Sequence, residues 1–91
     1  SFISLTKILP EPLKLCNEKA ILIALIKPQF ELEKKYISKG GVVRNEKLRT
    51  QVCEDIKFWL ENKMNWNVNQ IIESPIKGPK GNVEYLIYAN K

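Results

Sequence analysis

The chain has 91 residues, of which 44% are hydrophobic and 27% are charged. These fractions are those of a folded globular domain, and they argue against a disordered tail, a collagen-like repeat or a fibrous coil. The net charge of +5 suits a polyanionic partner, but plain protein surfaces also carry such a charge. The longest apolar run covers residues 20–26, whereas a helix needs roughly 20 residues to cross a bilayer, so we expect no membrane span.

The ends and the reactive side chains narrow the possibilities further. The chain begins at Ser1 and its only methionine is Met64, so we expect it to be a piece of a longer protein. It has no histidine, and Cys16 and Cys53 are far apart, without the spacing of a metal site. We therefore expect no metal site, no histidine-based catalysis within these residues, and two reduced thiols, as in a cytoplasmic protein.

The first predicted element is a helix that two prolines interrupt. Residues 4–15 carry leucine and isoleucine at helical spacing, after Ser and Thr residues that favour a helix start. Pro10 and Pro12 cannot sit in the interior of a regular helix, so we expect short turns or a broken helix here.

The second predicted element is a strand. Residues 20–26 are all apolar and are followed by Pro28. A run of this length before a helix breaker predicts a strand that is buried on both faces, as in a parallel sheet covered by helices. Residues 29–44 are polar and contain a glycine pair, which predicts a loop, with a helical turn around residues 31–36.

A long helix follows this loop. Asn45 is a good N-cap, Glu46 complements the positive end of a helix, and the pattern continues to Lys63. The apolar positions recur at spacings of three and four, at Leu48, Val52, Ile56, Trp59 and Leu60. This spacing predicts an amphipathic helix with Leu48, Ile56 and Trp59 in the core.

Two further strands are predicted after the helix. Residues 66–72 and 83–88 have the composition of strands, and the turn-rich residues 74–82 join them without a helix. Strands joined in this way are most simply antiparallel, and we expect the last strand to lie between the other two. The sequence therefore predicts an α/β sheet that ends in an antiparallel hairpin with flanking helices.

Four strings of the sequence resemble one known family. They are residues 1–6 (SFISLT), 25–31 (LIKPQFE), 39–44 (KGGVVR) and 74–86 (SPIKGPKGNVEYL). In this order and spacing they resemble the C-terminal half of the methyltransferase domain in the hemolysin A (TlyA) family, which is similar to the FtsJ/RrmJ-like RNA 2'-O-methyltransferases. The resemblance covers essentially the whole chain. It implies that residues 1–91 are the C-terminal portion of a single domain with a Rossmann-like methyltransferase fold.

The resemblance also implies a cofactor, a substrate and two catalytic residues. The family carries an S4-type RNA-binding domain and a cofactor-binding half, both absent here, and uses S-adenosylmethionine to methylate ribosomal RNA on cytidine. RrmJ-like enzymes use a Lys-Asp-Lys-Glu tetrad, of which the second Lys corresponds to Lys27 and the Glu to Glu84. The Asp lies two residues upstream of the position of Ser1, so this chain alone holds half of the tetrad. We expect it to be inactive and not to bind the cofactor tightly.

Elementary chemistry supports the same two positions. Lys27 follows the buried strand, and Glu84 lies at the start of an antiparallel strand, so both are expected at one edge of the sheet and in one cleft. A ribose 2'-hydroxyl is a poor nucleophile. An amine beside it can accept or steer its proton, and a carboxylate can fix the amine and the ribose.

Other residues allow two interpretations. The Gly40 and Gly41 pair could cradle a phosphate, but we favour a turn, as for Pro79 and Gly81. Phe30 and Tyr36 could stack an RNA base. Five lysines are solvated by default but could meet RNA phosphates: Lys34, Lys35, Lys39, Lys77 and Lys80.

Three functions compete on the sequence alone. We favour the methyltransferase; the alternative is a non-catalytic RNA-binding or ribosome-assembly module that kept the fold. A pore-forming hemolysin is argued against by the seven-residue apolar run of residues 20–26. The same run predicts an open strand edge, through which we expect copies of the chain to associate.

Overall fold

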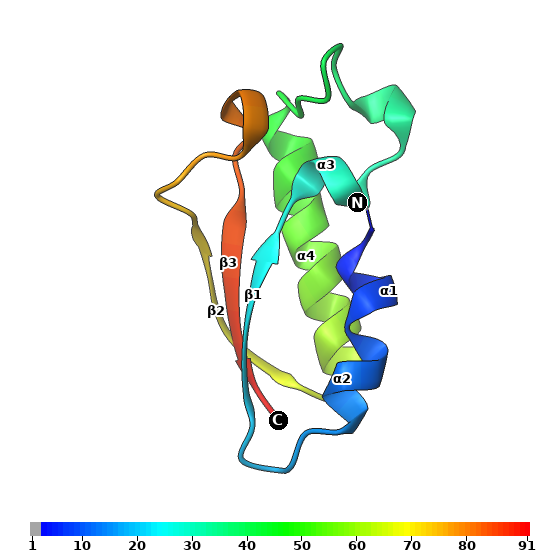
Figure 1. Cartoon of the computed structure of the whole chain (residues 1–91), viewed down its shortest axis with the longest axis vertical. Coiled ribbons are helices and arrows are strands. Elements are labelled where there is room, and N and C mark those ends of the chain that lie inside the picture. The colour runs from blue at the N-terminus through cyan, green and yellow to red at the C-terminus, as the bar shows by residue number, and fades with distance from the viewer. Residues whose placement is uncertain (1–2) are drawn as a thin grey trace.

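The computed structural model describes residues 3–91, which form a sheet and a set of helices (Figure 1). The helical segments are α1 (Leu5–Ile8), α2 (Pro10–Lys14), α3 (Pro28–Glu31), α4 (Glu46–Asn62) and the short 3-10 turns η1 (Lys34–Tyr36) and η2 (Pro79–Gly81). The strands are β1 (Ile21–Ile26), β2 (Asn67–Glu73) and β3 (Tyr85–Asn90). In Figure 1 the sheet lies on one side of the molecule and α1, α2 and α4 lie on the other.

The sheet is antiparallel, with the strands in the order β1-β3-β2. The last strand of the chain therefore lies between the other two, which confirms the predicted order and the predicted hairpin. Strand β3 begins at Tyr85, slightly later than the sequence predicts, and a bulge interrupts β2 between Val68 and Gln70. Within residues 3–91, β1 pairs only with β3, so the parallel pairing that its composition favours is not present in the described part of the chain.

Helix α4 has the bounds that the sequence predicts. The side chain of Asn45 accepts a hydrogen bond from the Leu48 backbone N–H at 3.2 Å, and the helix closes at Lys63. Its buried face carries Val52, Cys53, Ile56 and Leu60. This face packs on the inner side of the sheet, where Ile26, Ile87 and Ala89 are fully buried.

The broken helix at the start of the chain is also confirmed. Pro10 begins α2 immediately after α1 ends, and Leu9 is at once the C-cap of α1 and the N-cap of α2. Leu13 is buried in the core, and Leu5 and Leu9 pack against it. Proline at the first position of a helix lacks only an N–H that would have no partner there, which explains why two short helices follow each other.

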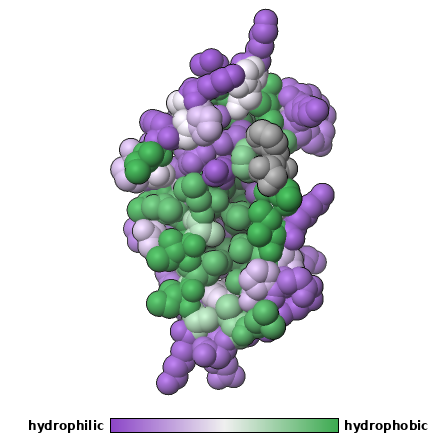
Figure 2. All heavy atoms as spheres, viewed as in Figure 1, coloured by the Kyte–Doolittle hydropathy of each residue, from purple (hydrophilic) through white to green (hydrophobic). Residues whose placement is uncertain are grey.

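Strand β1 is not buried on both faces, and this part of the prediction is wrong for the described residues. Ile26 is fully buried, but Ile21 and Ile23 are 78% and 63% exposed. The helices cover only the opposite face of the sheet, so alternate side chains of β1 remain open to solvent. Figure 2 shows apolar atoms gathered over the middle of this view, around the sheet and the first helices.

Candidate functional site

Lys27 and Glu84 lie at one edge of the sheet, by which we mean the end at which β1 finishes and β3 begins. Ile26, the last residue of β1, pairs with Tyr85, the first residue of β3. The next residues beyond this pair are Lys27 and Glu84, so the two backbones continue from neighbouring register positions. The expectation that both residues follow the same edge of the sheet is confirmed at the level of the backbone.

Glu84 carries a buried carboxylate that neighbouring residues hold in place. Its side chain is part of a residue that is only 5% exposed, and the Gln29 Nε2 donates a hydrogen bond to its Oε2 at 2.9 Å. A Cβ on Gly78 would collide with the end of the Glu84 side chain, so the carboxylate occupies the space that a side chain at position 78 would take. The φ angle of Gly78 is −78°, which any residue can adopt, so backbone strain is not the reason for this glycine.

Lys27 faces a different set of neighbours. Its Nζ lies 5.1 Å from the centre of the Phe30 ring, in a cation–π contact. Together with Ile3, Leu25 and other residues it borders a cavity of about 170 Å³. Among residues 3–91, the ion pairs within 4.0 Å do not include Lys27 and Glu84. The two groups share an edge of the sheet without direct charge contact.

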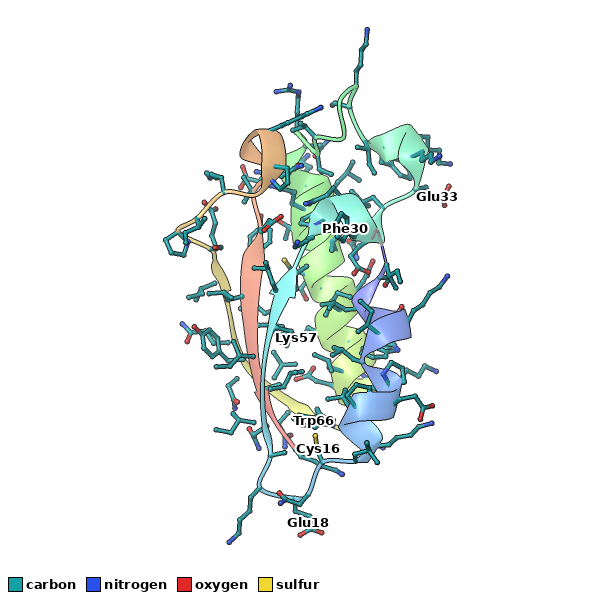
Figure 3. The ribbon with its side chains drawn as sticks, viewed as in Figure 1. Cys16, Glu18, Phe30, Glu33, Lys57 and Trp66 are labelled. Carbon is teal, nitrogen blue, oxygen red and sulfur yellow. The ribbon has the colours of Figure 1, made fainter. Side chains whose placement is uncertain are left out.

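A larger cavity lies on the other side of Phe30. It measures about 610 Å³ and is lined by Gln29, Phe30, Leu32, Lys34, Ile37, Ser38 and Gly41. Phe30 borders both cavities and projects from α3 in Figure 3. Gln29 connects the larger cavity to the buried carboxylate, because it lines the cavity and donates to Glu84.

The glycine pair forms a tight turn at the same end of the molecule. Ser38 and Val42 are bridged, and the Gly41 N–H donates to the Ser38 carbonyl at 3.0 Å. Gly40 and Gly41 have φ angles of 89° and 82°, which side-chain-bearing residues rarely adopt. The glycine pair therefore forms the predicted turn.

Asn82 ties this turn to the connector between β2 and β3. The residue is 3% exposed; its Oδ1 accepts from the Val43 N–H at 2.9 Å, and its Nδ2 donates to the Gly41 carbonyl at 2.9 Å. The same Nδ2 also donates to the Pro79 carbonyl at 3.2 Å. The segments 38–44 and 78–84 are thus held together by one buried amide, which explains why both family-like strings lie at one end of the fold.

Sequence reasoning did not assign roles to Gln29, Glu31, Gly78 or Asn82. Glu31 does not contact Lys27 or Glu84 in any hydrogen bond or ion pair described for residues 3–91. Its Oε1 accepts a hydrogen bond from the Ser4 hydroxyl at 2.6 Å, and its Oε2 accepts one from the Leu5 N–H at 2.9 Å. It therefore anchors the start of α1 to the end of α3. All four residues lie within the strings that resemble the known family. The spacing of these strings does not distinguish a residue that binds a ligand from one that only stabilises the fold.

Metal ligands, membrane-spanning helices and reactive thiols are the other features that bear on function. No group of histidine, cysteine, aspartate and glutamate within residues 3–91 could hold a metal ion. No helix of this part of the chain is both long enough and apolar enough to cross a membrane. Burial, and then the charge of Glu54, raise the pKa of the Cys53 thiol to about 11, so it stays protonated at neutral pH and is a poor nucleophile.

Comparison with known proteins identifies the family. The FtsJ-like methyltransferase family matches residues 1–91. The chain is 44% identical over 88 residues to hemolysin A of Brachyspira hyodysenteriae, covering 97% of the chain and 36% of that protein. It is 35% identical over 88 residues to the 16S/23S rRNA (cytidine-2'-O)-methyltransferase TlyA of Mycobacterium tuberculosis (strain CDC 1551 / Oshkosh), covering 97% of the chain and 32% of that protein.

A solved structure shows the same arrangement. The chain superposes on a Streptococcus thermophilus protein described as a hemolysin with a TM-score of 0.92 and 35% sequence identity, covering 100% of the chain and 32% of that structure. The chain thus spans about a third of the length of these similar proteins. The fold and the sequence agree with the resemblance that the four strings carry, and the chain belongs to the FtsJ-like methyltransferase family.

Proposed function

We propose that residues 1–91 are the C-terminal portion of the methyltransferase domain of an S-adenosylmethionine-dependent enzyme that methylates the 2'-hydroxyl of cytidine in ribosomal RNA. The observation that carries this proposal is the position of Lys27 and Glu84 directly beyond the Ile26 and Tyr85 pair. The name of the mycobacterial relative supports the choice of ribosomal RNA and of cytidine. The S4-type RNA-binding domain and the cofactor-binding half belong to the remainder of the proposed protein.

The proposed chemistry assigns a part to each residue. Lys27 accepts or steers the proton of the attacking 2'-hydroxyl, and Glu84 provides a fixed negative charge that orients the ribose. The hydrogen bond from Gln29 and the close approach of Gly78 keep the carboxylate in one place. Methyl transfer then depends mainly on alignment, which is what a rigid sheet edge provides.

The cavity beside Lys27 supports a link to the rest of the tetrad. Ile3 and Lys27 border the same cavity of about 170 Å³. The family resemblance puts the aspartate of the tetrad two residues before Ser1, and that position is only a few residues from Ile3 in sequence. In the longer protein, the aspartate would thus precede a segment that borders the same cavity as Lys27.

The residues of this chain do not fit the cofactor. S-adenosylmethionine in Rossmann-like folds lies beside a glycine-rich loop between a strand and the helix that follows it. Within residues 3–91, Gly40 and Gly41 follow η1, and Gly78 and Gly81 lie between two strands. We therefore derive no step of the reaction from the cofactor and propose that this chain alone neither binds it tightly nor methylates RNA.

A non-catalytic RNA-binding module is the second candidate. The net charge of +5 and the exposed lysines near the sheet edge favour RNA contact with or without chemistry. One relative is named hemolysin A, but the described residues contain no helix that could cross a membrane. With ribosomal RNA as substrate, the cytoplasm is the proposed location of the protein.

Methyl transfer by the longer protein tests the proposal. The complete protein would be incubated with ribosomal RNA that lacks the modification and with labelled S-adenosylmethionine, and digested nucleosides would be analysed by mass spectrometry. We expect 2'-O-methylcytidine with the wild-type protein and a strongly reduced rate with Glu84→Gln at unchanged RNA affinity. Absence of any labelled nucleoside from a folded, RNA-binding wild-type protein would favour the non-catalytic module instead.

A further inference from the structure

We propose that the cavity of about 610 Å³ beside α3 binds one base of a single-stranded RNA segment. This inference rests on the proposed function, because it gives a place to the nucleotide at or next to the reacting ribose. The cavity volume lies within the range of roughly 300–1,000 Å³ that is usual for small-molecule sites. A single nucleobase is the part of an RNA chain that can enter such a cavity while its sugar and phosphates stay outside.

The walls of the cavity suit an aromatic base. Phe30, Leu32 and Ile37 provide apolar surface, and Gln29 and Ser38 provide polar atoms beside it. Unpaired bases in RNA are bound by stacking on aromatic side chains and by hydrogen bonds from amides and hydroxyls to their edges. Gly41 adds backbone but no side chain to this lining.

The charges at the rim suit the phosphates on either side of such a base. Lys34 lines the cavity, and the Lys80 Nζ lies 3.5 Å from the position that a Cβ on Gly40 would take. Of the nearby acidic groups, Glu31 borders the other cavity, where its carboxylate accepts hydrogen bonds from Ser4 and Leu5. Glu33 forms an ion pair of 3.9 Å with Lys35. The lysines at the rim therefore attract a polyanion, and the aromatic and polar lining of the cavity favours RNA over an acidic peptide, which has no base to stack.

The cavity is coupled to the candidate catalytic edge through Gln29. The Nε2 of this side chain donates to Glu84, which fixes the orientation of the amide. Its Oε1 is buried and has no hydrogen-bond partner among the described residues. Because Gln29 both lines the cavity and donates to Glu84, this amide is the direct contact between the base site and the candidate catalytic carboxylate.

Binding of a single-stranded RNA of about ten nucleotides to the 91-residue chain tests the base site. We expect Ile37→Glu, which puts a charge into the cavity, to weaken binding by roughly tenfold, the scale of one lost base stack. Leu15→Glu is the matched control: it adds the same charge at a residue that is 88% exposed just after α2 and outside the cavity lining, and we expect a loss of less than about threefold. Affinities would be measured by fluorescence anisotropy, and circular dichroism would check the fold.

A second pair of variants keeps the test valid if Ile37→Glu does not fold. Lys34→Ala at the cavity should lose clearly more affinity than Lys19→Ala in the exposed loop before β1. Equal losses within both pairs, or no RNA binding by the wild-type chain, would overturn the base site. Methyl transfer by the longer protein that is unaffected by Ile37→Glu would overturn it as well and leave the proposed enzyme intact. Selective loss in the cavity variants would support the base site even if methyl transfer were never detected.

Discussion

A carboxylate that is 5% exposed must have partners that repay its loss of hydration, and the partners of Glu84 are few and specific. Gln29 donates to it, and Gly78 has no side chain because the carboxylate occupies that space. The glycine in the connector thus has a steric role that its backbone angles do not reveal. A larger residue at position 78 should first displace the Glu84 side chain.

Gly78→Ala tests this role. The added methyl group collides with the Glu84 carboxylate, and overpacking of this kind typically costs about 1–3 kcal/mol of unfolding free energy. We expect lower stability in urea denaturation, with partial recovery when Glu84→Asp shortens the side chain in the double variant. Additive losses in the double variant would show that the two residues do not compete for this space.

Cys53 gives a pH-dependent prediction. Burial, and then Glu54, raise the pKa of its thiol to about 11 from 9.0, so the folded chain holds this proton more tightly than the unfolded chain. Its contribution to stability is complete below pH 9 and is lost as the pH rises towards 11, because the unfolded thiol ionises first. Cys53→Ala should show a smaller fall in stability over this window, as measured by urea denaturation. An identical fall in both proteins would contradict the assignment.

At the scale of elements, Glu31 connects two helices that are far apart in sequence. Its carboxylate accepts from the Ser4 hydroxyl and the Leu5 N–H, so α1 has a helix cap supplied by α3. The K-P-Q-F-E string therefore contains one candidate catalytic group, Lys27, and one group that stabilises the fold close to it, Glu31.

Glu31→Ala should lower the unfolding free energy by about 0.5–2 kcal/mol, the usual cost of a lost helix cap. Glu33→Ala is the control, because Glu33 is exposed and forms only a 3.9 Å ion pair with Lys35; it should cost less than about 1 kcal/mol. Chemical denaturation of both variants makes the comparison. Equal losses would mean that Glu31 contributes no more than a surface charge.

The sequence predicts the helices and strands better than it predicts their burial and their long-range contacts. The bounds of α4 follow from Asn45 and the apolar spacing, and the antiparallel pairing of β2 and β3 follows from the missing helix between them, because both are local signals. The exposure of Ile21 and Ile23 could not be predicted, since an all-apolar run does not say which face is covered. The contact of Gln29 with Glu84 joins residues 55 apart in sequence, and no spacing rule encodes it.

At the scale of the whole molecule, the open face and edge of β1 are the conspicuous features. Ile21 and Ile23 are exposed, and within the described residues β1 has a neighbour on one side only. Exposed apolar strands of this kind pair with other chains unless something covers them. We therefore propose that the isolated 91-residue chain associates with further copies through this edge.

Light scattering over a range of concentrations tests the association. We expect the average mass to rise with concentration for the wild-type chain and to fall towards the monomer for Ile23→Lys, which puts a charge on the strand. Ile76→Lys is the matched control, because Ile76 is 76% exposed in the connector outside the sheet, and we expect it to associate like the wild type. A wild-type chain that remains a folded monomer at high concentration would rule out this edge.

Single-turnover methyl transfer by the longer protein with Lys27→Ala, with RNA affinity measured in parallel, tests the proposed catalytic role of Lys27 most directly. Lys27 is proposed to act at the reacting hydroxyl, so we expect a rate loss of at least about a hundredfold with RNA affinity changed by less than about threefold. Lys19→Ala, in the exposed loop before β1, should leave both quantities unchanged. A Lys27→Ala protein that transfers methyl groups at nearly the wild-type rate would contradict the assignment of this sheet edge as the catalytic site.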